Sequence, residues 1–107
     1  MPRVAVAVVS WNTRDLLARC LESLAAQEGA ELETWVVDNA STDGSAELVR
    51  DSHPEVELVA SDENLGFGPA VNLVAQRTST PWIAMANADV ALRPGALRAR
   101  LDAGERD

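Results

Sequence analysis

Four short apolar runs in the sequence each end in polar residues that could hold a ligand. The endings are Ser10-Trp11-Asn12, Val37-Asp38-Asn39, Ala60-Ser61-Asp62 and Asn87-Ala88-Asp89. If the runs are parallel strands that alternate with helices, all four endings fall on one edge of a sheet. Ligands of open α/β sheets bind outside the carboxyl ends of the strands. The sequence therefore predicts a binding site along that edge.

Two aspartates at these endings could do chemistry. Asp38 could accept a hydrogen bond from a base N–H or a ribose hydroxyl. Asp89 could bind a hard divalent cation, which takes its remaining ligands from water and substrate phosphates, so that one or two protein carboxylates suffice. In the alternative interpretation Asp38 and Asp43 only close a turn and cap the next helix, as short polar side chains commonly do, and Asp89 only occupies a turn. Position alone leaves both interpretations open.

The composition limits the classes of function. The 107 residues are enough for one domain with a single hydrophobic core, and 47% of them are apolar. The net charge of −8, with nine arginines and no lysine, excludes nucleic acid as the expected partner because phosphates would be repelled. No apolar run reaches membrane-spanning length, and the start lacks the layout of a signal peptide. The expected compartment is the cytoplasm, with peripheral attachment to the inner face of the membrane as an alternative.

The elements that must position these residues follow from the apolar pattern. Val4 to Val9 form a β-branched run typical of a strand buried on both faces, which predicts the central strand. Asn12 and Thr13 offer side-chain oxygens to cap a helix that runs to about Gln27. Further strands are predicted over 34–37, 56–60 and 82–86, and further helices over 45–51, over 69–76 with Pro69 in the first turn, and from Pro94 onward. This alternation predicts a three-layer, Rossmann-like α/β half-domain with a mostly parallel sheet in the order 3-2-1-4.

The glycines of Gly66-Phe67-Gly68 are not a dinucleotide fingerprint. Val71 takes the place of the third glycine, and the match follows the third predicted strand instead of the first. The glycines are better interpreted as letting backbone pass close to a ligand or as shaping the start of the next helix. A phosphate-binding loop of the G-x-x-x-x-G-K-[ST] type is excluded because it needs a lysine.

Taken together, these motifs resemble the GT-A-fold glycosyltransferases of family two, and among them the rhamnosyltransferase-like branch. The resemblance runs from Val4 to about Pro94, and its parts are weak singly and specific in combination. They are Val8-Val9-Ser10-Trp11-Asn12, Leu16 to Leu24, Trp35 to Ser45, Asn64-Leu65-Gly66-Phe67-Gly68 with Asn72, and Ala86-Asn87-Ala88-Asp89.

The resemblance implies a nucleotide-diphosphate-sugar donor, with dTDP or UDP as the nucleotide, bound across the strand ends. Asp38 matches the acid that contacts the base, and Ser10 and its neighbour Asn12 match the strand end beside the base. Asp89 matches the Mg²⁺ or Mn²⁺ ligand of the D-x-D element. The remaining donor-binding positions implied are Asp43 of the D-G-S turn, Asn64, Gly66 and Gly68 of the loop bordering the nucleotide, and Asn87 on the ribose side.

Asn87 departs from the family pattern, because it stands where D-x-D has its first acid. The metal should therefore depend on Asp89 and the diphosphate. The family carries its catalytic base in its C-terminal half, so no catalytic residue is assigned within residues 1–107, which correspond to the nucleotide-sugar-binding part of a truncated GT-A fold. We expect inverting transfer to a hydroxyl acceptor, such as a cell-envelope glycan, by the whole enzyme and none by this chain alone.

Two other functions and one assembly are weighed beside this interpretation. The same sheet could serve as a non-catalytic nucleotide-binding or interaction module. A flavodoxin-like receiver domain is disfavoured because such domains use a lysine near the phosphorylated acid. An unpaired edge on the fourth strand also predicts a homo-dimer, since exposed apolar edges invite pairing with another chain.

Overall fold

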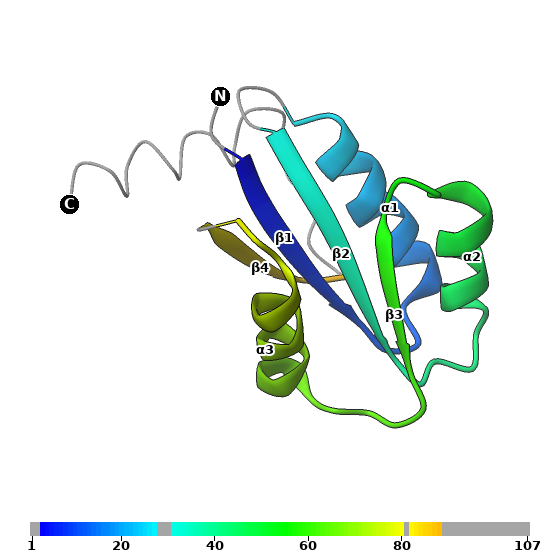
Figure 1. Ribbon diagram of the computed structural model, residues 1–107. Helices are drawn as coiled ribbons and strands as arrows, with labels where there is room; N and C mark the ends of the chain where they lie inside the picture. The colour runs from blue at the N-terminus through cyan, green and yellow to red at the C-terminus, as the bar shows by residue number, and fades with distance from the viewer. Residues whose placement is uncertain (1–2, 28–30, 81, 89–107) are drawn as a thin grey trace.

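The valine-rich run near the start of the chain lies at the centre of a parallel sheet in the computed structural model, which describes residues 3–27, 31–80 and 82–88. Strand β1 (Arg3–Ser10) pairs with β2 (Glu31–Asn39) on one side and β4 (Ile83–Asn87) on the other, and β3 (Glu57–Ser61) adds to β2. All three pairings are parallel, and the order is β3-β2-β1-β4 (Figure 1). The predicted strand order 3-2-1-4 is confirmed.

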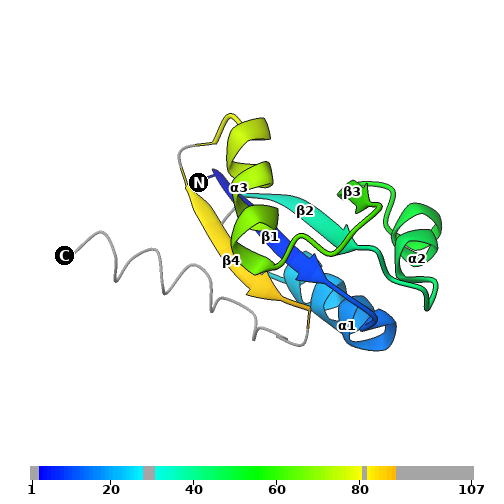
Figure 2. The same ribbon diagram turned by 90° about the horizontal axis from the view of Figure 1, so that it is seen from below.

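Within the described ranges, three helices cover the two faces of this sheet. Helices α1 (Arg14–Ala25) and α2 (Ser45–Ser52) lie on one face, and α3 (Phe67–Arg77) lies on the other, which gives three layers (Figure 2). Parallel strands need such crossover helices to return the chain to the starting edge. Each helix therefore begins at the carboxyl edge of the sheet, and the loops before the helices gather there.

Strand alternation divides the core into two clusters. Val4, Val6 and Val8 of β1 pack with Leu17 of α1 and Val49 of α2 on one face. On the opposite face, the second cluster is formed by Ala7, Val9, Val37, Ala70 and Val74. Successive side chains of a strand point to opposite faces, so the same alternation decides on which side of the sheet each polar residue at a strand end lies.

Two elements begin earlier than the sequence pattern predicts. Strand β2 begins at Glu31 instead of residue 34, because β1 pairs with it from Arg3↔Glu31 onward. Helix α3 begins at Phe67, so that Pro69 is its third residue, still within the first turn where a missing N–H is tolerated. Each start adds a single apolar residue, Leu32 between two glutamates in β2 and Phe67 beside a glycine in α3, which is too little to extend the apolar pattern.

The predicted capping of α1 by Asn12 and Thr13 is wrong. Thr13 is the N-cap residue but makes no side-chain capping bond, and its hydroxyl instead pairs with Ser10 Oγ at 3.0 Å. The Asn12 Oδ1 atom accepts a hydrogen bond from the N–H of Thr42, 30 residues later, at 2.8 Å. Both side chains serve tertiary contacts, and the cap of α1 comes from another loop.

Two of the sequence predictions concern residues that the structure does not describe. Asp89 and the helix predicted from Pro94 lie outside the described residues. Across the described ranges, no helix is long and apolar enough to cross a membrane.

Candidate functional site

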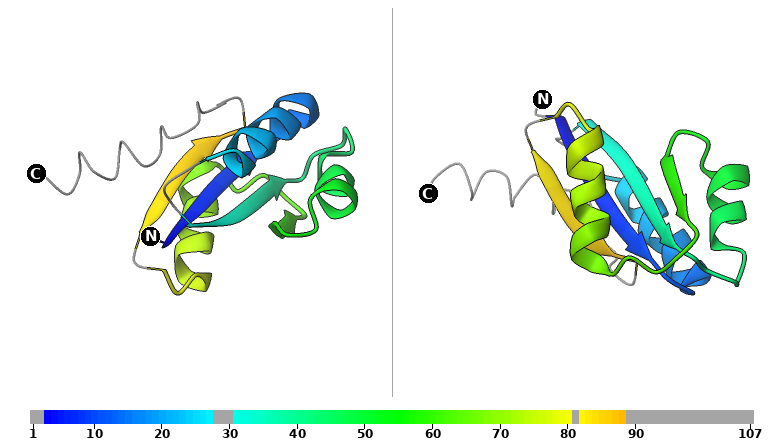
Figure 3. Two further views of the ribbon diagram at one scale, coloured as in Figure 1. Left: turned by 90° about the horizontal axis from the view of Figure 1, so that it is seen from above. Right: turned by 60° about the horizontal axis from the view of Figure 1, so that its bottom comes forward.

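A cleft of about 440 Å³ opens at the carboxyl edge of the sheet. Asn39, Asn64, Gly66 and Asn87 contribute its polar groups. The rest of its wall comes from Val9, Trp11, Thr13, Leu16, Phe67 and Ala88. The loop from β3 to α3 passes the ends of the central strands, where this cleft is formed (Figure 3). Three residues predicted for donor binding, Asn64, Gly66 and Asn87, are therefore brought together from segments far apart in the sequence.

The register of the strands places the predicted residues on two different faces. Ser10 pairs with Asp38, and Val9 pairs with Asn87. Because Val8 and Val36 face α1, alternation puts Ser10 and Asp38 on that side as well. Asn39 and Asn87 share the opposite side with α3. Asp38 and Asn87 thus occupy one edge of the sheet but not one face, and Asp38 does not line the cleft.

Asp38 organises the turn that follows β2. Its side chain is 3% exposed, and its two carboxylate oxygens accept hydrogen bonds from Ser41, at 2.5 Å from Oγ and 3.2 Å from the backbone N. Ser41 Oγ in turn accepts the N–H of Asn12 at 2.9 Å. The turn-closing role of Asp38 is therefore visible, and its contact with a base stays a prediction.

Asp43 caps two helices at once. Its Oδ1 accepts hydrogen bonds from the Ser45 hydroxyl at 2.5 Å and the Ser45 N–H at 3.1 Å, and its Oδ2 accepts the N–H of Arg14 at 3.0 Å. The Ser45 hydroxyl, followed by the two backbone N–H groups, holds the pKa of Asp43 below its ordinary value against the opposing effect of burial. Asp43 thus fixes the relative position of α1 and α2 at the carboxyl edge.

The loop before α3 has a backbone conformation that depends on glycine. Gly66 has φ 80° and ψ 179°, a region that residues with a Cβ essentially do not populate. The Asn64 Oδ1 atom accepts the N–H of Gly66 at 2.9 Å, which closes a local turn. Gly68 lies in the first turn of α3 with open space where a Cβ would be, so the structure gives it no comparable requirement for glycine.

Asn39 is a cleft residue that the sequence analysis did not assign. It is 2% exposed, its Oδ1 accepts the N–H of Leu65 and its Nδ2 donates to the carbonyl of Gly66, both at 3.3 Å. The available signal was its position directly after Asp38, which strand alternation places on the opposite face.

The described residues could assist in binding a metal ion but do not form a complete metal site. Mg²⁺ and Mn²⁺ take oxygen ligands and bind readily through one or two carboxylates together with substrate phosphates. Within the described ranges, no three acidic, histidine or cysteine side chains gather into a metal-binding group. Asn87 supplies an uncharged amide oxygen beside the cleft, and Asp89, the predicted ligand, lies outside the described residues.

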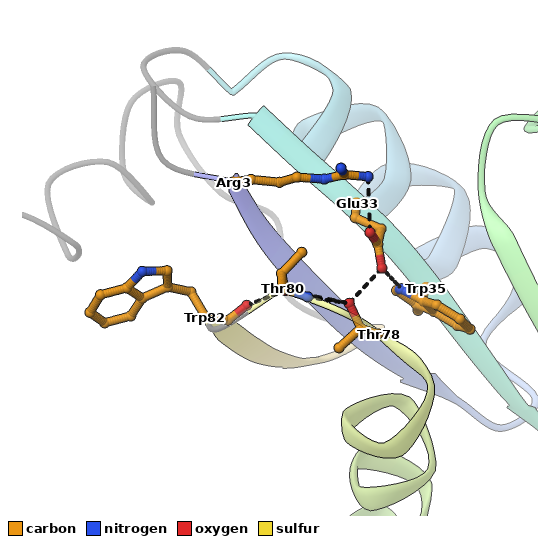
Figure 4. A network of polar contacts seen from close by, with 6 residues as sticks. All are labelled: Arg3, Glu33, Trp35, Thr78, Thr80 and Trp82. Carbon is orange, nitrogen blue, oxygen red and sulfur yellow. Dashed lines mark hydrogen bonds and ion pairs between the residues drawn. The ribbon is translucent and has the colours of Figure 1, made fainter.

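A larger cavity, of about 640 Å³, lies at the opposite, amino edge of the sheet, and its polar centre is Glu33. The Oε1 atom of Glu33 accepts hydrogen bonds from Thr78 Oγ1 and Trp35 Nε1 at 2.6 and 2.7 Å, and its Oε2 pairs with Arg3 at 3.1 Å (Figure 4). These contacts, Thr78 first, lower the pKa of Glu33. Both carboxylate oxygens of Glu33 are used in contacts that join β1, β2 and the end of α3. The smaller cleft at the carboxyl edge, where ligands of open α/β sheets bind, is therefore the better candidate site.

Comparison with known proteins shows the family of the chain. The sequence profile of Glycosyl transferase family 2 matches residues 5–107. The chain is 37% identical over 103 residues to the succinoglycan biosynthesis protein ExoO of Rhizobium meliloti. It is 33% identical over 112 residues to the N-acetylglucosaminyl-diphospho-decaprenol L-rhamnosyltransferase of Mycobacterium tuberculosis. These alignments cover 95% and 94% of the chain but 30% and 36% of the relatives, so the chain spans about a third of their length.

Among solved structures, the chain resembles the mannosyltransferase PcManGT from Pyrobaculum calidifontis, determined in complex with GDP-Man and Mn²⁺. The TM-score is 0.76 and the identity 32%, with 84% of this chain and 28% of the other covered. The resemblance to family two and to the GT-A fold that the motifs indicated is confirmed.

Proposed function

The chain belongs to glycosyl transferase family 2, and we propose that its carboxyl-edge cleft binds the donor, a nucleotide-diphosphate sugar with dTDP or UDP as its nucleotide. The observation that carries this proposal is the convergence of Asn64, Gly66 and Asn87 on one cleft beside the ends of parallel strands. The amide side chains and backbone groups there can bind ribose and base atoms without requiring a charged partner. The mannosyltransferase that the chain resembles was determined with a sugar nucleotide, which supports the class of ligand.

Each predicted donor-binding residue keeps a role in this proposal. Asn64, Gly66 and Asn87 contact the donor directly. Ser10, Asn12 and Asp43 hold the β1–α1 and β2–α2 loops in place through the hydrogen bonds described above, while Gly68 keeps the start of α3 free of side-chain bulk. Asp38 reaches the base from the neighbouring face at the same edge.

We assign the divalent cation, Mg²⁺ or Mn²⁺, to Asp89 together with the donor diphosphate. When bound, such a cation neutralises the charge that develops on the leaving diphosphate. Asn87 lies two positions before Asp89 and offers an oxygen without charge. Metal binding should therefore be weak without nucleotide, because one carboxylate and an amide provide little charge of their own.

Transfer of the sugar needs a group that the described cleft does not supply. Inversion at the sugar carbon requires a carboxylate to deprotonate the acceptor hydroxyl. None of the described residues that line the cleft is an aspartate or a glutamate. We therefore propose that residues 1–107 bind donor without transferring it. For the whole protein, we propose that the base comes from further sequence and that the acceptor is a hydroxyl of a cell-envelope glycan. The proposed compartment is the cytoplasm, with attachment to the inner face of the membrane as the alternative.

The exposed side of β4 is proposed as a homo-dimer contact. In the described ranges β4 pairs with β1 alone, and Ile83 and Met85 on its α3-facing side are 36% and 60% exposed. Sedimentation should show association at high concentration that the substitution Met85→Lys reduces, because a lysine opposes edge pairing. A monomer at all concentrations would contradict this part of the proposal.

A non-catalytic nucleotide-binding or interaction module is the second candidate. Asp38 and Asp43 both use their carboxylates within the chain, and Asn87 replaces an acid, which are the observations that favour it.

Calorimetric titration with UDP, dTDP and GDP, with and without Mn²⁺, separates the two functions. The donor-binding function predicts nucleotide affinity that Mn²⁺ strengthens and that Asp89→Ala makes independent of the metal. Asp51→Ala, which removes a carboxylate from the exposed surface of α2, should leave the metal effect intact. Binding that does not depend on the metal, or no binding of any nucleotide, would contradict the donor-binding function and favour the module.

A further inference from the structure

The loop that lines the cleft between β3 and α3 is exposed and needs something to hold it. Asn64 and Gly66 are both exposed, and Gly66 has a backbone conformation that is one of many open to a glycine. Ser61, at the end of β3, bonds the neighbouring Glu63, and the amide side chain of Asn39 bonds Leu65 and Gly66 to β2, a strand distant in the sequence.

Asn39 is well built for this task. It is the last residue of β2, an interior strand whose residues from Val36 onward are at most 3% exposed. Its amide uses both ends, accepting from the N–H of Leu65 and donating to the carbonyl of Gly66. A side chain with one acceptor and one donor, pointing at consecutive peptide groups, fixes both the distance and the orientation of the loop. Leucine, serine or aspartate at this position could not make the same pair of bonds.

We propose that Asn39 is a positioning residue for donor binding, acting through the Asn64–Gly66 loop and not by contact with the reacting atoms. This inference rests on the proposed function, since the loop residues are those assigned to the nucleotide. Asn39 transfers the rigidity of the sheet to the loop, so that Asn64 and Gly66 are held at the cleft before the nucleotide arrives. Binding then does not have to bear the entropy of ordering the loop.

The same contacts set the start of α3. Gly66 is the N-cap residue of that helix, and Phe67, its first residue, lines the cleft. A shift of Gly66 would therefore move the amino end of α3 relative to Asn87 on β4. Asn39, which lines the same cleft, therefore sets the spacing between the start of α3 and β4.

The test compares Asn39→Ala and Asn39→Asp with the unmodified chain in two measurements, hydrogen exchange of the Leu65 amide and affinity for UDP in the presence of Mn²⁺. Alanine removes both hydrogen bonds. Aspartate keeps the shape and the acceptor for Leu65 but replaces the donor to Gly66 with an acceptor, and it remains informative if alanine destabilises the fold. The loss of one neutral hydrogen bond corresponds to about a fivefold effect, so exchange of the Leu65 amide should become about fivefold faster or more in Asn39→Ala, and affinity for UDP should fall by a similar factor.

Val59→Ala is the matched control. Val59 lies on β3 and packs against the α3-side cluster without bonding the loop, so its truncation lowers stability and leaves the Asn39 contacts in place. This variant should keep both the exchange rate at Leu65 and the affinity. A folded Asn39→Ala or Asn39→Asp that binds nucleotide as tightly as the unmodified chain would overturn the inference and leave the proposed function standing. Failure of the unmodified chain to bind any nucleotide would overturn the proposed function and the positioning role together.

Discussion

Asp43 accepts a hydrogen bond from the backbone N–H of Arg14 at 3.0 Å, although 29 positions separate the two residues. The same carboxylate also bonds the N–H and hydroxyl of Ser45. One side chain therefore satisfies the free donors at the starts of two neighbouring helices, α1 and α2. This arrangement ties the loops after β1 and β2 into one unit beside the candidate site.

Replacing Asp43 should destabilise the fold through both helices. Loss of a helix cap costs about 1 kcal/mol, and Asp43 serves two helices, so Asp43→Ala should lower the free energy of unfolding by about 1–2 kcal/mol. Asp43→Asn keeps one acceptor oxygen, so its free energy of unfolding should lie between those of the parent and Asp43→Ala. Chemical denaturation measures the difference. Asp51→Ala, in the last turn of α2, is the control and should be neutral, and equal effects of the two alanine variants would refute the capping role.

Glu33 should make the protein sensitive to acid. Its folded-state pKa is lowered, chiefly by the Thr78 and Trp35 hydrogen bonds, so the folded protein holds fewer protons on this group than the unfolded chain does. The stabilisation is complete above the ordinary value of 4.5 and is lost as the pH falls through the lower folded pKa.

The substitution Glu33→Gln tests this dependence. It should cost about 1–2 kcal/mol at pH 7, because hydrogen bonds to a charged group are lost, and the cost should shrink below pH 4.5. Glu22→Gln removes the same charge from the exposed face of α1 and should change stability little. If Glu33→Gln lowers the free energy of unfolding by the same amount at pH 7 and at acid pH, the charge of the Glu33 carboxylate is not the source of the stabilisation.

Ala40 occupies the left-handed region, with φ 62°, in the turn organised by Asp38. That conformation costs an L residue roughly 1–2 kcal/mol, and the greater freedom of an unfolded glycine offsets about 0.5–1 kcal/mol of the relief. Ala40→Gly should therefore raise the free energy of unfolding by about 0.5–1 kcal/mol. Ala46→Gly, within α2, should lower it by about 1 kcal/mol. The midpoint of thermal unfolding should rise for Ala40→Gly and fall for Ala46→Gly. A lower midpoint for both variants would contradict backbone strain at Ala40.

Gly66 and Gly68 should respond oppositely to alanine. Neither has a heavy atom within 4 Å of an added Cβ, so conformation alone decides the outcome. Gly66→Ala should cost about 1–3 kcal/mol because of its φ and ψ, whereas Gly68→Ala, in the first turn of α3, should be neutral or stabilising by up to about 1 kcal/mol. Unfolding measurements on both variants would disprove the distinction if Gly66→Ala were as stable as the parent.

Patterns within a segment were enough to predict the sheet. The valine and alanine run of β1 is buried on both faces, which is why it indicated the central strand, and the polar residues after each run mark the carboxyl edge where the cleft lies. The order 3-2-1-4 followed because parallel strands with crossover helices leave few alternatives.

Contacts between distant segments could not be predicted in this way. The cap of α1 depends on the register Ser10↔Asp38, which brings Asp43 to Arg14. The role of Asn39 depends on which face of β2 it occupies and on where the loop at Leu65 passes. The first residues of β2 are stabilised by pairing with β1 and by the hydrogen bond that Thr78, at the end of α3, donates to Glu33. These contacts form only when the chain is folded.

The account stands on the claim that nucleotide binds at the carboxyl edge of the sheet and not in the larger cavity at the amino edge. Mapping backbone amide chemical shifts during titration with UDP and Mg²⁺ tests it most directly. The largest changes should fall on Asn39, Leu65, Gly66 and Asn87. Changes confined to Thr34, Trp35 and Ser79, which border the amino-edge cavity, would contradict the claim.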